Sequence, residues 1–183
     1  MKKITFITGN QGKADFMAKF LDFKIPHQKL NLDEIQSLDL HEITEHKARQ
    51  AYQKIKSPVL VEDVSFVYEA LGKLPGPFIK WFLESLGEAG VCDLVSRFEN
   101  RRATGSVCFC YFDGKKLKFF DGQVRGTVAK EPKGSDGYGW DFIFIPDGTT
   151  KTYGEMNDEE KERFSLRTTT VYPQIKQFLE RID

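Results

Sequence analysis

The chain has 183 residues, and its 27 basic and 27 acidic side chains give a formal net charge of zero. A chain of this length can bury one substantial core, so we expect a single domain over residues 1–183. A neutral surface has no general attraction for nucleic acid or for an anionic membrane, and we expect neither as a partner. The apolar runs are far shorter than the roughly 18 residues of a membrane span. The apolar run in the opening MKKITFITGN is too short for the hydrophobic region of a signal peptide and is followed at once by polar residues, so the expected location is the cytoplasm.

The first third of the sequence alternates between strand and helix patterns. In chain order, strands are predicted over Ile4–Thr8, His27–Leu32 and Val59–Val61, and helices over Gln11–Phe23 and His41–Ile55. The third strand is expected to end in Glu62-Asp63. This order is typical of a βαβ unit.

The rest of the sequence predicts helices followed by hairpins. Gly87 separates two predicted helices, and Asp113-Gly114 is a strong hairpin turn signal. Strands are predicted over Thr104–Phe112, Lys116–Phe120, Gln123–Ala129 and Trp140–Ile145, and helices over Phe78–Leu86, Ala89–Phe98, Asp158–Arg163 and Val171–Ile182. The predicted fold class is mixed α/β.

Cysteine and histidine do not suggest a metal centre by their spacing. The odd set Cys92, Cys108 and Cys110 fits no zinc or disulfide framework. We expect three buried thiols in a reducing compartment. His41 and His46 are five apart and do not share a helical face, so a histidine metal site is not expected.

The segment Thr8-Gly9-Asn10-Gln11-Gly12-Lys13 follows a predicted strand and opens a predicted helix. Backbone N–H groups at the start of a helix favour anions, and Lys13 would add a positive charge one turn later. Thr8, Gly9, Asn10 and Lys13 are therefore candidate phosphate contacts. The alternative is an ordinary strand-to-helix turn capped by Asn10.

Acidic residues are the candidate metal ligands. Glu62 and Asp63 follow a buried strand, and ligands of α/β sheets bind at the carboxyl ends of strands. Glu34 lies in a polar loop after the second predicted strand. Carboxylates next to a phosphate site suit Mg²⁺, which prefers a few hard oxygen ligands completed by water and substrate phosphate. The alternative is that these acids are merely solvated.

Two further segments carry candidate nucleotide contacts. Around Tyr138, Gly139, Trp140 and Asp141, glycine would let a planar base approach an aromatic ring and stack on it. The alternative places Trp140 in the core and Tyr138 at a turn. Farther along, Lys161, Ser165 and Arg167 could bind phosphate and base, or could form a solvated charged helix start.

Taken together, the motifs resemble the inosine triphosphate pyrophosphatase family, whose members remove non-standard purine triphosphates. The resemblance covers nearly the whole chain in the family's order, through TGNQGK, VEDVSF, LPGPFIKWFL, GYGWDFIFIPDG, TYGEM and EEKERFSLR. It implies an elongated mixed sheet flanked by helices, two lobes with a central cleft, and usually a homodimer. It also implies Mg²⁺-dependent hydrolysis of a nucleoside triphosphate to the monophosphate and pyrophosphate.

The resemblance gives roles to individual residues. It implies that Asp63 is the catalytic acid and binds the metal with Glu34, while Glu62 stays open as an alternative base. The implied substrate contacts are Thr8, Asn10, Lys13, Lys47, Tyr138, Lys161, Ser165 and Arg167.

The sequence departs from the family at two positions. Leu166 stands where the family has the histidine of a Ser-His-Arg triplet at the base pocket, and Val64 replaces a usual Ser or Thr. Leucine cannot hydrogen-bond a 6-oxo group, so base selectivity is expected to be altered or relaxed. The alternatives are a related enzyme for modified pyrimidine or methylated nucleotides, or an inactive nucleotide-binding homologue.

Overall fold

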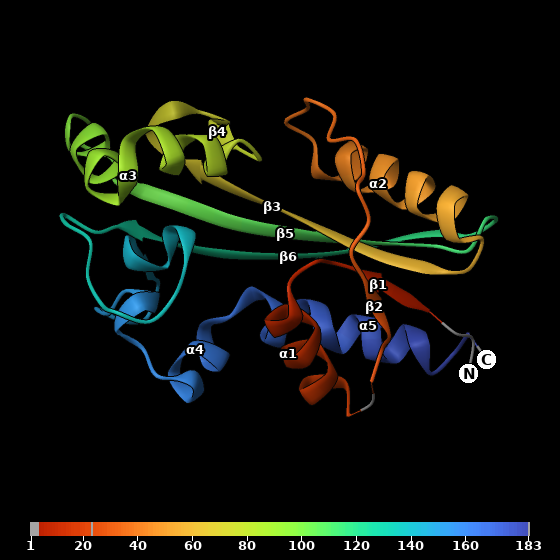
Figure 1. The fold of residues 1–183 in the computed structure, drawn as a ribbon. Helices are drawn as coiled ribbons and strands as arrows, with labels where there is room; N and C mark the ends of the chain where they lie inside the picture. Colours follow the sequence, from red (N-terminus) through yellow and green to blue (C-terminus); the bar gives the residue numbers. More distant parts are fainter. Residues whose placement is uncertain (1–3, 23, 183) are drawn as a thin grey trace. The chain divides into compact units, whose positions relative to one another are not determined.

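The computed structural model describes residues 4–22 and 24–182 and shows a mixed α/β fold (Figure 1). The strands are β1 (Thr5–Ile7), β2 (His27–Gln28), β3 (Val59–Tyr68), β4 (Pro75–Gly76), β5 (Arg102–Phe112), β6 (Leu117–Val128) and β7 (Phe144–Pro146). The helices are α1 (Gln11–Leu21), α2 (Leu40–Ile55), α3 (Ile79–Ser96), α4 (Asp158–Phe164) and α5 (Tyr172–Leu179). The strands form one open sheet in the order β2-β1-β3-β5-β6-β7, and β4 pairs with β3.

The chain divides into two compact units that interleave in sequence. The first unit comprises residues 1–63, 107–122 and 167–183, and the second comprises residues 64–106 and 123–166. The long strands β3, β5 and β6 contribute residues to both units.

The first unit contains the parallel strands β2, β1 and β3. Helix α2 covers one face of these strands, where Ala48 and Ala51 pack with Val59, Val61 and other apolar side chains (Figure 1). Helices α1 and α5 cover the other face and contact each other through aromatic rings. Because β1 lies between β2 and β3, the chain leaves β1 on one side and returns on its other side. The carboxyl end of β1 is therefore a topological switch point, which is where open α/β sheets bind ligands.

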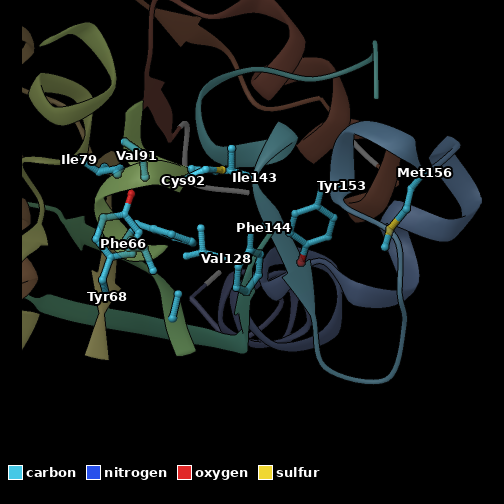
Figure 2. Packing of buried hydrophobic residues seen from close by; sticks show 12 residues of the cluster. Phe66, Tyr68, Ile79, Val91, Cys92, Val128, Ile143, Phe144, Tyr153 and Met156 are labelled. Carbon is cyan, nitrogen blue, oxygen red and sulfur yellow. The ribbon is translucent and has the colours of Figure 1, made fainter. Parts of the chain in front are cut away.

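The second unit has its own apolar core, which Figure 2 shows around Phe66, Val128 and Phe144. The rings of Phe66 and Phe144 meet edge to face with centroids 5.1 Å apart. Helix α3 supplies Val91 and other side chains to this core. Gly87 inside α3 has φ 66° and ψ 171°, which confirms the predicted break between two helical segments.

Several predicted element boundaries are wrong. Strand β3 continues to Tyr68 instead of ending at Glu62-Asp63, because Val64–Tyr68 is itself a β-branched and aromatic run. The two strands predicted over 116–129 are one strand, β6. The predicted strand over Trp140–Ile145 is a 3₁₀ turn at Gly139–Phe142 followed by the short β7.

Other boundaries differ in smaller ways. Strand β2 has two residues instead of six. The helix predicted over Val171–Ile182 is the shorter α5, and a π-helical turn at Arg167–Val171 precedes it. The end of the first predicted helix, at Phe23, lies outside the described residues. The three cysteines are buried and unpaired by disulfides, as predicted. None of the helices in the described part of the chain has the length and apolar character that a membrane crossing requires.

Candidate functional site

The loop between β1 and α1 is held by its own side chains. The Asn10 side chain caps α1 by accepting a hydrogen bond from the Lys13 backbone N–H at 3.1 Å. The Thr8 hydroxyl accepts from the Asn10 N–H at 3.1 Å. A Cβ at Gly9 would lie 2.9 Å from the Lys29 side chain, so glycine lets that lysine cross the loop. The cap predicted for Asn10 is confirmed, while its contact with phosphate stays a prediction.

The loop lies beside the acidic pair of β3. In the parallel register of β1 and β3, Thr5 pairs with Val59 and Phe6 pairs with Leu60. Two further steps in the same register bring Thr8 next to Glu62. The pair is therefore not at the carboxyl end of its own strand, as the sequence predicted, but in mid-strand beside the carboxyl end of β1. The strand that ends at this place is the neighbouring strand β1, while β3 continues past the two acids.

The Asp63 side chain points to the face of the sheet that α2 covers. There Asp63 and Glu34 both pair with Lys47. The Lys47 ammonium donates to Asp63 Oδ2 at 2.9 Å and to Glu34 Oε1 at 3.3 Å. The Lys47 and Asp63 side chains are largely buried, at 16% and 20% exposed, whereas Glu34 is 71% exposed. Burial lowers the pKa of Lys47, but the two carboxylates outweigh it and leave that pKa above its ordinary value. Glu34 and Asp63 thus converge on one positive charge.

Glu62 points to the opposite face, because successive side chains of a strand alternate. Its carboxylate forms ion pairs with the ammonium of Lys13 and with Arg167, whose Nε lies 3.3 Å from Oε2. The Glu62 side chain is 6% exposed. Burial alone would raise the pKa of Glu62, but Arg167 and Lys13 outweigh it and lower that pKa. Glu62 therefore links Lys13 and Arg167, which are two of the residues predicted to contact the substrate.

The two carboxylates around Lys47 are chemically suited to hold a Mg²⁺ ion. Two carboxylates from separate segments face one cation, and carboxylate oxygen is the ligand type that Mg²⁺ uses. Glu34 is exposed enough for waters to complete an octahedral shell. Glu34 and Asp63 are the residues that would hold the ion, with Lys47 displaced from between them.

In the second unit, Tyr138 and Trp140 are in different environments. Tyr138 is 61% exposed. Trp140 stacks on Phe66 with ring centroids 4.9 Å apart and packs against the apolar core. The Asp141 carboxylate accepts a hydrogen bond from the Tyr138 N–H at 3.2 Å, and Gly139 has φ 63°. The core packing favours the structural role for Trp140, while Tyr138 is largely exposed and its stacking on a base stays a prediction.

The lysine of the last motif is held by a loop of the second unit. The Lys161 ammonium donates to the Asp136 carboxylate at 2.6 Å and to its carbonyl at 3.0 Å. Ser165 caps the end of α4, and Leu166 is buried at 5% exposed. Leu166 is therefore an apolar packing residue at the position where the resemblance expects a histidine. The substrate contacts of Gly139, Lys161 and Ser165 stay predictions.

Two features of the site were missed by the sequence analysis. Glu62 was considered as a base, yet its ion pairs with Lys13 and Arg167 could not be foreseen, because Arg167 is 105 residues away in the chain. Lys29 was not considered at all. It follows β2, whose Gln28 carbonyl accepts from the Thr8 N–H at 3.1 Å, and this pairing brings Lys29 against Gly9.

Comparison with known proteins shows similarity along nearly the whole chain. A family model described as the Ham1 family matches residues 4–176. "Inosine triphosphate pyrophosphatase 2" of Trypanosoma cruzi is 44% identical over 169 residues, which cover 90% of this chain and 86% of that protein. The inosine triphosphate pyrophosphatase of Schizosaccharomyces pombe is 38% identical over 184 residues, covering 98% and 96%.

Solved structures share the fold at lower identity. A HAM1 protein from Coxiella burnetii superposes with a TM-score of 0.87 at 22% identity, covering 98% of this chain and 99% of that chain. The Staphylococcus aureus Ham1 protein gives a TM-score of 0.82 at 22% identity, covering 98% of both chains. At this identity the two structures show the fold alone.

Proposed function

The chain belongs to the Ham1 family, and from that premise we propose that it is a nucleoside triphosphate pyrophosphatase acting on non-standard purine nucleotides. The proposed reaction converts ITP, dITP or XTP to the monophosphate and pyrophosphate with Mg²⁺ as cofactor. The relatives at 38–44% identity carry the name inosine triphosphate pyrophosphatase. A homodimer in the cytoplasm remains part of the proposal.

One observation of the structure carries the proposal: Glu34 and Asp63 converge on a single cationic group beside the phosphate-type loop. A triphosphate has roughly four negative charges and needs a metal as well as lysines to offset them. The loop supplies N–H groups and Lys13 at the start of α1. The two carboxylates and the loop with Lys13 both lie at the topological switch point of the first unit.

We assign the proton transfer to Asp63. In the proposed step, water attacks the α-phosphorus, Asp63 accepts a proton from it, and the bond from the α-phosphorus to the bridging oxygen breaks to release pyrophosphate. Bound Mg²⁺ would offset the phosphate charge and polarise the reacting P–O bonds. Lys13 would bind the phosphates and Lys47 would stabilise the charge that develops on the leaving group.

The alternative base, Glu62, is less suited to proton transfer. Its carboxylate is buried and bound by two cations, which lower its pKa. A carboxylate whose charged form is stabilised in this way is a weaker base. We therefore propose that Glu62 positions Lys13 and Arg167 instead.

Arg167 is the candidate for reading the purine. A 6-oxo purine presents an acceptor where adenine presents an amino donor, and a guanidinium has only donors to offer. Since Leu166 removes the second expected hydrogen-bonding group, we propose a weaker preference for 6-oxo purines than a histidine at this position would give. A pyrophosphatase with relaxed base selectivity is the second candidate function, and Leu166 is the residue that favours it.

The proposal is tested by the product and by the substrate range. The purified chain is incubated with Mg²⁺ and ITP, XTP, dITP, the four standard triphosphates, and methylated or modified pyrimidine triphosphates, and pyrophosphate and phosphate are measured separately. We expect pyrophosphate, fastest from the 6-oxo purines. Tight ITP binding without any pyrophosphate would establish the inactive homologue instead.

The role of Asp63 is tested by Asp63→Asn. We expect loss of turnover by about a thousandfold or more, since a positioned base and a metal ligand are removed together. Asp93→Asn is the control, because Asp93 is an exposed acid on α3 that pairs with Arg97. Thermal melting of both variants checks the fold. Near-normal turnover of Asp63→Asn would remove Asp63 from the mechanism.

A further inference from the structure

Three potential metal ligands lie close together on the first unit, and none of them belongs to the candidate site described above. His41 from α2, Cys108 from β5 and Asp121 from β6 each offer one ligand atom, and these three atoms lie within 4.8 Å of one another. We propose that His41, Cys108 and Asp121 form a binding site for a thiophilic divalent cation of the zinc type.

The sheet register places the cysteine and the aspartate side by side. At one end of the β5–β6 hairpin, the Asp113 N–H bonds to the Lys116 carbonyl, and at the other end the Val128 N–H bonds to the Arg101 carbonyl. Both bonds belong to the same antiparallel register, which sets Cys108 opposite Asp121. Residues directly opposite have Cβ atoms about 4.5–5.5 Å apart on the same face of the sheet.

His41 is held over this pair by three contacts. Its backbone N–H donates to the capping Asp39 carboxylate at 2.8 Å at the start of α2. Its ring stacks on Phe119 with centroids 4.2 Å apart and planes 2° apart. Its Nε2 lies 2.9 Å from Asp121 Oδ1. The imidazole is therefore already oriented toward the Asp121 carboxylate.

The mixture of ligands selects the class of metal. One sulfur, one imidazole nitrogen and one carboxylate oxygen suit zinc, whereas Mg²⁺ prefers oxygen alone. Tetrahedral zinc at these bond lengths places ligand atoms about 3.5 Å apart. The half-exposed side chains of His41 and Asp121, at 48% and 54%, can rotate to close the remaining gap and leave an entry path. Water would supply the fourth ligand.

Binding is linked to loss of a proton. The Cys108 thiol is fully buried and lies 3.3 Å from the Thr44 hydroxyl, and burial raises its pKa. Zinc would bind the thiolate, so the sulfur–metal bond forms as the S–H bond breaks and its proton leaves to solvent. Thiolate and carboxylate together would balance the charge of the cation.

Two polar side chains lie beside this site, and of these the Thr44 hydroxyl contacts a ligand atom, the Cys108 sulfur. Gln174 donates from its side chain to the Asp121 backbone carbonyl at 3.4 Å, and Thr44 donates to the Leu40 carbonyl at 2.7 Å. These two bonds end on backbone carbonyls, so they leave the three ligand atoms available. Cys110 lies two residues along the same strand and is equally buried, but it is not part of the three-residue group.

The experiment is a Co²⁺ titration of the full chain without nucleotide, followed by competition with Zn²⁺. We expect a thiolate-to-cobalt charge-transfer band in the wild type and in Cys110→Ser, and loss of that band in Cys108→Ser. His41→Ala and Asp121→Asn, both at exposed positions, should weaken Zn²⁺ binding about tenfold or more. Since no nucleotide is present, the result is independent of the pyrophosphatase proposal.

Two results would overturn the metal site. One is a wild-type chain that gives no charge-transfer band and no thermal stabilisation by Zn²⁺. The other is a Zn²⁺ affinity that is the same in the wild type, His41→Ala and Asp121→Asn, which would place any bound metal elsewhere.

Discussion

Replacing Glu62 by glutamine keeps the shape of the side chain and removes its charge from a nearly buried position. Lys13 and Arg167 would then face a neutral amide, whose carbonyl can accept from one of them while its NH₂ opposes the other. A hydrogen bond to a charged group contributes about 1.5–3 kcal/mol. Lys13 and Arg167 are 28% and 17% exposed, so water recovers part of the loss. We expect unfolding to become easier by about 1–3 kcal/mol.

The effect on activity follows from the same contacts. If Glu62 holds both cations where the substrate needs them, their displacement should lower kcat/KM by about tenfold to a hundredfold, at 1.4 kcal/mol per tenfold. The loss should lie mainly in KM, because both cations bind the substrate before and during the reaction. If Glu62 were the catalytic base, the Glu62→Gln variant would instead show its loss in kcat. Glu45→Gln is the matched control, since it breaks a surface pair with Arg49 within α2 and should cost less than about 0.5 kcal/mol.

The pH dependence separates the charge from the shape of Glu62. Its pKa is lower in the folded chain than the ordinary 4.5, so its stabilisation is present above pH 4.5 and is lost as pH falls through the folded value. The free energy of unfolding is measured in urea at a series of pH values. The difference in this free energy between the wild type and Glu62→Gln should narrow below pH 4.5. A gap that stays constant into strong acid, or a variant with unchanged KM, would refute the reasoning.

Three further variants test separate parts of the structure. Arg167→Ala should narrow the preference for ITP over ATP in kcat/KM, and an unchanged ratio would count against its contact with the base. Tyr138→Ala should raise KM by a factor consistent with about 1–3 kcal/mol of lost stacking and leave the melting temperature unchanged, because the ring is exposed; an unaltered KM would exclude stacking on Tyr138. Gly126→Ala should destabilise the fold by more than about 2 kcal/mol in denaturant unfolding, because its Cβ would lie 2.2 Å from the Ile145 carbonyl oxygen, and a wild-type midpoint would contradict that packing.

The sequence by itself determined the elements whose signals are local. The Asn10 cap, the break at Gly87 and the turn at Asp113-Gly114 depend on a few neighbouring residues, and each lies where the pattern predicted it. The order of motifs also identified the family, which the comparisons confirm.

Tertiary structure alone decided which side chains meet. The length of β3 depends on pairing with strands far away in the chain, so sequence reasoning ended the strand at the acids and gave the wrong reason for their position. Strand alternation then sends Glu62 to Lys13 and Arg167, and sends Asp63 to Lys47 and Glu34. The grouping of His41 with Cys108 and Asp121 likewise depends on hairpin register, because spacing along a chain does not encode proximity between a helix and two strands.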